Sequence, residues 1–195
     1  MLSDLEIRRK MFHLISGIII VGLIYYDIFN YITAAVLIVL LVIYGILVKK
    51  IRIPFVSVIF EYLERPKDFK TIPGKGSVFY LTGVFLVLVL FSKDIAMAGI
   101  IVMALGDAIA PIIGQYGLIE HPFNRKKYIE GSIGGGIIAF IGAMLFVSPL
   151  EAGVAAVAAM IVEGIDLKLR VNPLDDNIIM PLIAGSVIWL LRFLL

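Results

Sequence analysis

Residues 103–136, MALGDAIAPIIGQYGLIEHPFNRKKYIEGSIGGG, combine an acid, a basic cluster and a glycine-rich turn within a hydrophobic sequence. Asp107 interrupts an apolar run between Gly106 and Pro111, and the basic residues 125–127 follow it. Glu130-Gly131-Ser132 then leads into three glycines as hydrophobic sequence resumes. This order predicts two helices joined by a polar turn, with a site for a phosphorylated ligand where the turn meets a membrane.

The composition indicates an integral membrane protein. The 195 residues are 61% hydrophobic and 16% charged, with a mean hydropathy of +1.06, whereas about a quarter of the residues in a soluble domain are charged. The net charge of +2 is too small to indicate nucleic-acid binding. The absence of cysteine excludes disulfides, thiolate metal sites and cysteine nucleophiles.

Hydrophobic runs predict an all-α, polytopic bundle of about seven spans within one catalytic domain, residues 1–195. We expect the spans at residues 11–26, 31–48, 76–91, 95–118, 132–147, 151–164 and 178–194. Between the second and third, residues 55–63 form an amphipathic run that is typical of an interfacial segment.

The placement of Lys and Arg predicts the orientation, because cytoplasmic loops carry the excess of both. With seven spans, 15 of the 17 basic residues fall on one side, and only Lys93 and Arg192 fall on the other. We therefore expect a cytoplasmic N-terminus and an external C-terminus. The loops at residues 49–75, 119–131 and 164–177 then face the cytoplasm, so we expect the active site there. We expect the membrane to be a prokaryotic cell membrane or one of the ER type.

Asp107 is a functional candidate because an ionisable group within a span is costly. It lies about a dozen residues into the fourth expected span, which is roughly 18 Å at 1.5 Å per residue. Gly106, Pro111 and Gly114 favour a kinked helix that opens backbone groups to a polar pocket. The simpler alternative is a carboxylate that bonds a neighbouring helix.

Two glycine-lysine turns predict phosphate contacts. In the first, Lys127 precedes Glu130 at the mouth of the fifth span, where free backbone N–H groups and a lysine favour phosphate. Asp107 with Glu130 could hold Mg²⁺. Arg125 and Lys126 are equally explained as charges that fix topology. The second turn, Pro73-Gly74-Lys75-Gly76, resembles part of a phosphate loop without its full spacing.

The ends of other helices carry two more polar groups. Glu6, Arg9, Lys10 and His13 share one face of the first helix at i, i+3, i+4 and i+7. These residues could act in the function of the protein. Alternatively, the basic pair could anchor the helix at the interface and His13 could be a polar group bonded to a neighbouring helix, and both interpretations stay open. For Glu163, Asp176 and Asn177, at helix ends, we favour metal binding, and for Asp166 plain solvation.

These motifs together resemble the family of CTP-dependent lipid kinases, which includes dolichol kinases, phytol kinases and the yeast-type diacylglycerol kinase. The resembling pieces, in chain order, are Glu6-x-x-Arg9-Lys10-x-x-His13, Pro73-Gly74-Lys75-Gly76, Gly106-Asp107-Ala108-x-Ala110, Lys127-x-x-Glu130-Gly131-Ser132, Glu163, and Asp176-Asn177 with Pro181-Leu182. Two positions depart from the family pattern. Gln115 stands where many relatives have Arg, and Tyr128 where Ser or Thr is common, which puts details of nucleotide contact in doubt.

The resemblance implies that the γ-phosphoryl group of CTP is transferred to the hydroxyl of a membrane lipid, with Mg²⁺ as cofactor. It implies three sets of site residues. The catalytic set is Asp107, Lys127, Glu130 and His13. The nucleotide-binding set is Lys75, Gly74, Gly76, Lys126, Gly131, Ser132, Gly134, Arg9 and Lys10. The metal-binding set is Asp107, Glu163, Asp176 and Asn177. We expect an acceptor of the dolichol or polyprenol type; phytol, geranylgeraniol and diacylglycerol stay open, as does the oligomeric state.

Two rival functions remain at this point. Phosphatidate-type cytidylyltransferases also carry a lysine-x-x-Glu-Gly step, but their later P-G-H-G-G and D-R-x-D signature is absent from residues 162–181, VEGIDLKLRVNPLDDNIIMP. A small transporter would also use broken helices and an intramembrane acid. However, the expected outer connections are poor in polar groups, and no inverted repeat is evident.

Overall fold

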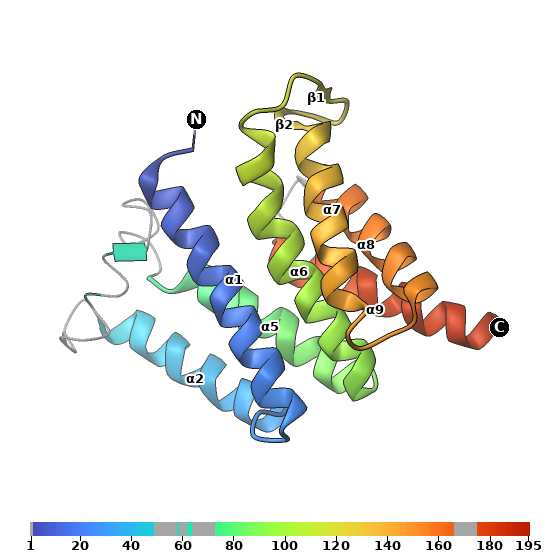
Figure 1. Ribbon diagram of the computed structural model, residues 1–195. Coiled ribbons are helices and arrows are strands. Elements are labelled where there is room, and N and C mark those ends of the chain that lie inside the picture. The colour runs from blue at the N-terminus through green and yellow to red at the C-terminus, as the bar shows by residue number, and fades with distance from the viewer. Residues whose placement is uncertain (1, 49–57, 59–61, 64–72, 166–174) are drawn as a thin grey trace.

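A computed structural model of the chain describes residues 2–48, 58, 62–63, 73–165 and 175–195. This part of the chain forms a bundle of helices with one short hairpin at its upper end (Figure 1). The helices are α1 (Asp4–Tyr25), α2 (Tyr31–Leu47), α5 (Lys75–Leu90), α6 (Lys93–Gly114), α7 (Ile129–Ala143), α8 (Pro149–Gly164) and α9 (Asp176–Leu194). The predicted helical fold is therefore confirmed, and each of the seven expected apolar segments overlaps one helix.

A two-stranded hairpin replaces part of the predicted loop at residues 119–131. Strands β1 (Glu120–His121) and β2 (Asn124–Tyr128) pair antiparallel, with Glu120 opposite Tyr128 and His121 opposite Asn124. The chain between α6 and α7 is therefore extended and paired. For this reason α6 ends at Gly114 instead of Leu118, and α7 already begins at Ile129.

Helix starts follow local capping chemistry. Ser3 accepts a hydrogen bond from the Glu6 amide at the start of α1. Asn30 with Thr33, and Ser148 with Glu151, form reciprocal capping boxes at α2 and α8. The caps at Ser3 and Ser148 place polar residues at both ends of the bundle, so the helix bounds are encoded locally.

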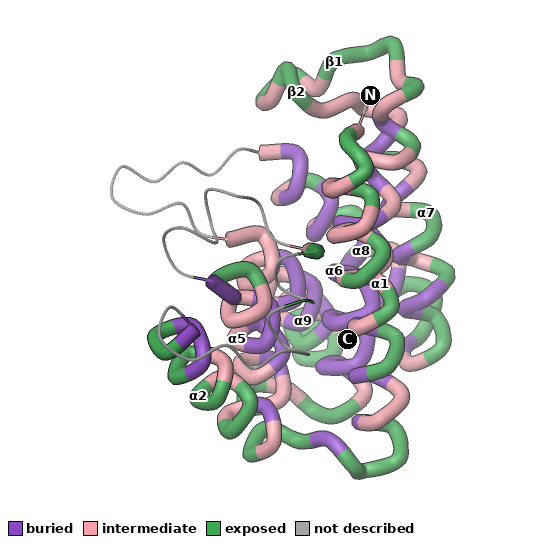
Figure 2. The backbone as a smooth tube through the Cα atoms, turned by 90° about the vertical axis from the view of Figure 1, so that its left-hand side faces the viewer, coloured by how far each residue is buried: buried purple, intermediate pink, exposed green. Residues whose placement is uncertain are grey.

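Helix α6 is the centre of the bundle and contacts α1, α5, α7, α8 and α9. Residues 95–104 are all buried, and many are alanine or glycine. Small residues let neighbouring backbones approach closely. For example, a Cβ atom on Gly135 of α7 would lie 2.9 Å from the carbonyl oxygen of Gly106. Buried residues gather in the middle of the bundle, whereas α2 and the hairpin carry many exposed residues (Figure 2).

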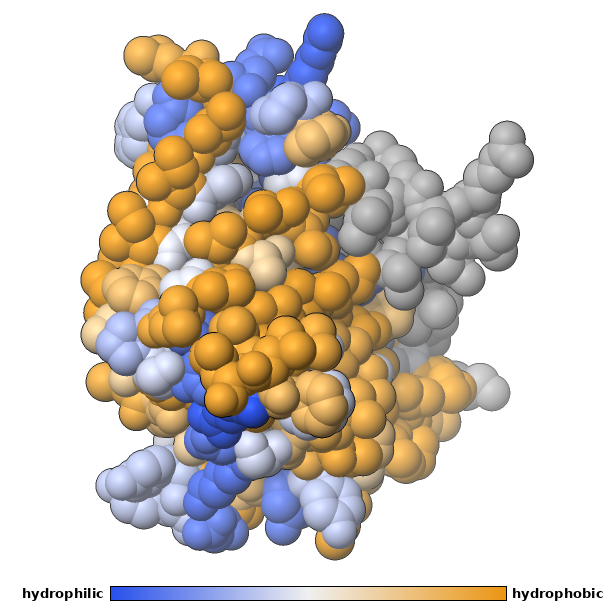
Figure 3. Space-filling view, turned by 90° about the vertical axis from the view of Figure 1, so that its right-hand side faces the viewer, coloured by the Kyte–Doolittle hydropathy of each residue, from blue (hydrophilic) through white to orange (hydrophobic). Residues whose placement is uncertain are grey.

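Exposed hydrophobic side chains cover much of the outer surface. The face in Figure 3 is hydrophobic across its middle, and hydrophilic residues gather in its upper and lower parts. Among the described helices, α6 and α9 are long and apolar enough to cross a membrane, and α2, α5 and α7 are shorter apolar helices. The expected amphipathic run at residues 55–63 falls mostly outside the described residues, and Asp166 lies outside them.

Ion pairs tie the helix ends that were expected to face outward. Lys93 Nζ lies 2.6 Å from Asp27 Oδ1 and also donates to the Tyr25 carbonyl. Arg192 bridges α6 and α8, with 2.6 Å to Asp94 and 2.5 Å to Glu151. The two basic residues assigned to the outer side by sequence thus both pair with acids at that same end of the bundle.

The Gly135 contact predicts a stability effect with a matched control. Gly135→Ala places a methyl group against the α6 backbone and should lower the unfolding midpoint in detergent, by about 1–3 kcal/mol of unfolding free energy. Gly22→Ala is the control, because a Cβ atom there meets nothing within 4 Å, so its midpoint should not fall. Equal midpoints for the two variants would contradict the close packing of α6 on α7.

Candidate functional site

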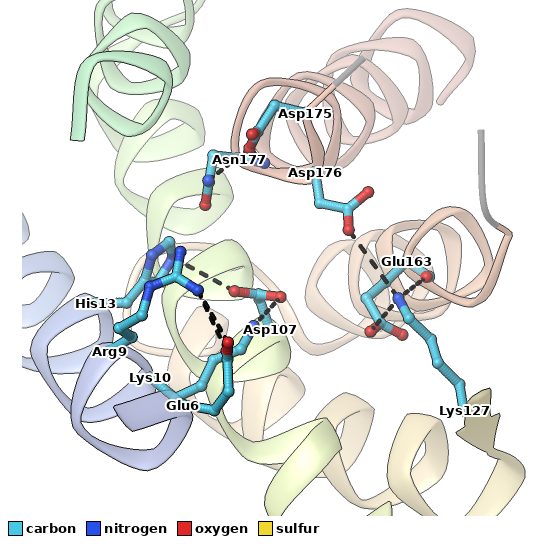
Figure 4. A network of polar contacts seen from close by, with 10 residues as sticks. All are labelled: Glu6, Arg9, Lys10, His13, Asp107, Lys127, Glu163, Asp175, Asp176 and Asn177. Atoms are coloured by element: carbon cyan, nitrogen blue, oxygen red, sulfur yellow. Dashed lines mark hydrogen bonds and ion pairs between the residues drawn. The ribbon is translucent and has the colours of Figure 1, made fainter. Parts of the chain in front are cut away.

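Asp107 on α6 is held by two residues of α1 at the end of the bundle opposite to the Arg192 ion pairs. Its side chain is buried, and Oδ1 accepts a hydrogen bond of 2.7 Å from Lys10 Nζ. Its second oxygen, Oδ2, lies 3.8 Å from His13 Nε2. Figure 4 shows both α1 side chains directed at this carboxylate. The ion pair explains how an acid is tolerated inside the bundle, because an opposite charge compensates its burial.

Arg9 lies beside this pair without contacting Asp107. Its guanidinium is 3.2 Å from the Glu6 carboxylate one turn earlier on α1. A Cβ atom on Gly76 would lie 3.9 Å from Arg9 Nη2, so the guanidinium also approaches the start of α5. Of the two predicted nucleotide-binding residues on α1, Lys10 is engaged by the acid and Arg9 borders the N-terminus of another helix.

A second ion pair joins the hairpin to α8. Lys127 Nζ lies 2.6 Å from Glu163 Oε1 and also donates to the Glu163 backbone carbonyl. It is 4.0 Å from Asp176 Oδ2 on α9. Glu163 is only 4% exposed, and its other oxygen, Oε2, is buried without a hydrogen-bond partner. Within the described chain, the hydrogen-bonding capacity of this oxygen is therefore unused.

The start of α9 brings Asp175, Asp176 and Asn177 to the same place. Asp175 caps the helix, and its Oδ1 accepts from both the backbone and the side-chain nitrogen of Asn177. Burial raises the pKa of the Asp175 carboxyl above its ordinary value. Asp176 is directed toward Lys127 (Figure 4). The α9 start therefore contributes one structural acid and one acid that faces the cluster.

Two site residues also precede a proline by four positions. Pro111 follows Asp107 within α6, and Pro181 follows Asn177 within α9. Because proline has no N–H, the backbone carbonyl four residues earlier loses its usual helical donor. The Asn177 carbonyl lies directly against Gly83 of α5, where no side chain would fit. The prolines thus leave carbonyl oxygens at the level of the site.

The two ion pairs form one polar cluster (Figure 4). Asp107, Glu163 and Asp176 come from three helices, and Asp176 lies within electrostatic range of both other acids and of Lys127. Carboxylate and amide oxygens suit a hard divalent cation, and lysines suit phosphate. In the described chain, no three acidic or histidine side chains stand close enough to hold a metal by themselves.

Glu130 does not join this cluster. Its carboxylate accepts hydrogen bonds from the backbone N–H groups of Leu118, at 2.8 Å, and Ile119, at 3.1 Å. The expected Asp107–Glu130 metal pair is therefore not formed. Instead, Glu130 ties the end of the α6–β1 turn to the start of α7, which positions the strand that carries Lys127.

The glycines after Glu130 serve helix packing. A Cβ atom on Gly131 would overlap the Ala110 carbonyl, and one on Gly134 would overlap the Ile113 side chain. Ser132, between them, is partly exposed. Gly131 and Gly134 let α7 approach α6, because tight helix crossings leave no space for side chains. Their expected contact with a nucleotide stays a prediction.

The other predicted nucleotide contacts lie at the rim. Gly74 adopts a positive φ of 83° at the start of α5, a conformation that favours glycine. Lys75 is exposed, with its ammonium 5.4 Å from the Phe79 ring. Lys126 is also exposed, next to Lys127 on β2. Both lysines are accessible to an anion, but neither forms an ion pair with Asp107, Glu163 or Asp176.

Sequence reasoning missed Tyr80 of α5. Its ring packs edge-on against His13 with centroids 4.3 Å apart, and its hydroxyl is buried without a hydrogen-bond partner in the described chain. A tyrosine inside an apolar helix, where its O–H needs a partner, is the signal that could have found it.

Comparisons with known proteins identify relatives, although no family model and no solved structure matches the chain. An uncharacterised protein of Methanocaldococcus jannaschii is 30% identical over 94% of this chain and 92% of its own length. A probable chloroplastic phytol kinase 2 of Glycine max is 33% identical over 60% of this chain and 45% of its own.

A CTP-dependent diacylglycerol kinase 1 of Schizosaccharomyces pombe is 22% identical over 60% of both chains. This chain thus spans about half the length of the named kinases that it matches. With these relatives, and with the Asp107 and Lys127 motifs in one cluster, the chain belongs to the CTP-dependent lipid kinase family.

Proposed function

We propose that this protein transfers the γ-phosphoryl group of CTP to the hydroxyl of a long-chain isoprenoid alcohol of the dolichol or polyprenol type. The observation that carries the proposal is the cluster in which acids from α6, α8 and α9 meet Lys10 and Lys127. The names of the phytol kinase and the diacylglycerol kinase relatives support a lipid alcohol as acceptor and CTP as donor.

The cluster suits phosphoryl transfer because this reaction depends on positioning and charge neutralisation. The hydroxyl oxygen forms a bond to the γ-phosphorus, while the bond from that phosphorus to the β–γ bridging oxygen breaks and CDP leaves. The hydroxyl proton passes to the pair formed by Asp107 Oδ2 and His13 Nε2, which lie 3.8 Å apart. Lys127 neutralises phosphate oxygens once it exchanges its contact with Glu163 for the nucleotide.

The donor set fits a magnesium ion that is shared with the nucleotide. Mg²⁺ is usually held by one or two carboxylates, with phosphates and water as its other ligands. The unpartnered Glu163 Oε2 and the partly exposed Asp176 carboxylate would hold it, with Asn177 and Asp107 nearby. When bound, the ion neutralises charge on the transferring phosphoryl group.

A membrane location agrees with a lipid acceptor. The polar cluster lies at one end of the bundle, and exposed apolar side chains cover the helices below it. We propose that the seven helices span the membrane with this end at the cytoplasmic face, where CTP is available. The segregation of basic residues in the sequence supports this orientation.

The direct test is a matrix of nucleotides and acceptors with purified protein and Mg²⁺. CTP, ATP and GTP are each supplied with polyprenol, phytol, geranylgeraniol or diacylglycerol, and the phosphorylated lipid is measured by mass. We expect product with CTP and a polyprenol. Product with diacylglycerol alone would contradict the isoprenoid acceptor. Formation of a CDP-lipid with release of pyrophosphate would instead indicate a cytidylyltransferase.

The position of Lys127 predicts a large kinetic effect for one of two neighbouring cations. Lys127→Met removes the charge next to Glu163 and Asp176, and should lower kcat/KM for CTP by about 100-fold or more. Arg125→Met, on the same strand, removes an exposed charge and should stay within a few-fold of the wild type. Similar losses in both variants would argue for a general electrostatic effect of the hairpin.

The hydrogen bonds of Glu130 predict that it acts by positioning. Glu130→Gln keeps a side-chain oxygen for the Leu118 and Ile119 amides and should retain most activity. Glu130→Ala should lose about 10- to 100-fold, because the strand that carries Lys127 shifts. Amide hydrogen exchange at Leu118 and Ile119 should rise in the Ala variant alone. If Gln and Ala lose activity equally while exchange is unchanged, Glu130 contacts substrate or metal directly.

A further inference from the structure

Two buried polar atoms beside Asp107 have no hydrogen-bond partner within the described chain. They are His13 Nε2 on α1 and Tyr80 Oη on α5. Tyr80 is 6% exposed, and the His13 side chain is 14% exposed. Buried polar atoms are nearly always hydrogen-bonded in folded proteins, since leaving one unpaired is costly. The pair therefore marks a place where a polar group of a ligand would find hydrogen-bond partners.

Three helices pack closely around these atoms. The His13 and Tyr80 rings meet edge to face with their planes at 77°. Gly17, one turn after His13, leaves room for the Tyr80 hydroxyl, because a Cβ atom there would lie 2.7 Å from Oη and would also overlap Ala104 of α6. Glycine on α1 and alanine on α6 thus let a tyrosine hydroxyl reach into the interface.

Asp107 approaches the same place without completing it. The 3.8 Å between His13 Nε2 and Asp107 Oδ2 is too long for a hydrogen bond. The other carboxylate oxygen is already paired with Lys10. No hydrogen bond therefore joins any two of the three atoms that meet here, which are Asp107 Oδ2, His13 Nε2 and Tyr80 Oη.

An alcohol hydroxyl is chemically complementary to this arrangement. It donates one hydrogen bond and accepts others, so it can donate to the His13 nitrogen and accept from the Tyr80 O–H. A lipid alcohol can also reach this place from the bilayer. The outer face of α1 next to His13 is apolar and exposed, with Phe12 at 47%, Ile15 at 49% and Ile19 at 55%.

We propose that His13 and Tyr80 form the subsite that binds the hydroxyl of the lipid acceptor and sets it beside Asp107. This inference rests on the proposed kinase function and identifies how its acceptor is recognised. The hydroxyl enters when α1 and α5 separate slightly at the His13–Tyr80 ring contact. Lys10 then holds Asp107 from one side, and the hydroxyl lies near the free carboxylate oxygen on the other.

This placement separates the two substrates. The acceptor hydroxyl lies between α1, α5 and α6, whereas Lys127, Glu163 and Asp176 lie toward α8 and α9 (Figure 4). Asp107 stands between the two groups. Tyr80 is a specificity-determining residue in this scheme, because it recognises the hydroxyl and not the hydrocarbon tail.

The test compares binding of alcohols with that of matched lipids without a hydroxyl. Geranylgeraniol is paired with its deoxy hydrocarbon, and dioctanoylglycerol with trioctanoylglycerol. Binding is measured as the rise in unfolding midpoint of the full chain in detergent. For the wild type, at least one alcohol should stabilise more than its partner. Tyr80→Phe and His13→Phe, which keep the rings and remove the polar atoms, should lose that preference.

Kinetics supply the second readout. Tyr80→Phe should raise KM for the lipid alcohol by about tenfold, the effect of one lost hydrogen bond to a buried group, and leave KM for CTP unchanged. Tyr26→Phe is the control, because Tyr26 is 73% exposed at the far end of α1. Wild-type alcohol preference and KM in both Tyr80→Phe and His13→Phe would overturn the subsite.

These experiments distinguish failure of the hydroxyl subsite from failure of the proposed kinase function. If the wild type phosphorylates no lipid but binds an alcohol in a Tyr80-dependent way, the subsite stands and the kinase assignment fails. If the wild type phosphorylates a lipid and the variants are unaffected, the kinase assignment stands and the subsite fails. A wild type that binds each alcohol no better than its hydroxyl-free partner also overturns the subsite.

Discussion

The buried ion pair between Lys10 and Asp107 is the interaction on which the rest of the site depends. A carboxylate inside an apolar bundle is stable only when another charge compensates it, and removing one partner of such a pair costs about 3–5 kcal/mol. Lys10 supplies that charge from the first helix. The pair therefore fixes where α1 lies against α6, and this in turn brings His13 to the second oxygen of Asp107 and the Tyr80 ring to His13.

Close packing around α6 makes this arrangement possible. The helix contacts five others, and small residues on both sides of its interfaces let backbones meet. Gly131 and Gly134, which the sequence suggested for a nucleotide turn, lie at the crossing of α7 on α6. Glu130 likewise has a structural contact, because its carboxylate accepts a hydrogen bond from the Leu118 amide in the turn after α6. Several motif residues thus act on the site through the positions of helices and strands.

Charged groups at the two ends of the bundle have different roles. At one end, Arg192 and Lys93 satisfy acids from neighbouring helix termini. At the other end, the acids and lysines are only partly satisfied within the described residues, where an oxygen of Glu163 and a nitrogen of His13 have no hydrogen-bond partner. Fully paired charges stabilise a fold, whereas buried polar atoms without partners are expected where a ligand binds. This contrast indicates that ligands bind at the end of the bundle that carries Glu163 and His13.

The sequence alone determined the helices and the residue types of the site, because apolar runs, caps and prolines act locally. Seven apolar segments correspond to seven helices in the described chain, and Lys127 lies against Glu163 and Asp176. Which charged side chains pair with one another across the chain was decided only by the tertiary structure. Periodicity does not specify which lysine meets which acid, so the contact of Lys10 with Asp107 and those of Glu130 with the Leu118 and Ile119 amides were not predicted. The hairpin and Tyr80 also went unrecognised. Their roles arise from strand pairing and from contacts between helices that are far apart in sequence, and the packing of α6 against its neighbours sets both.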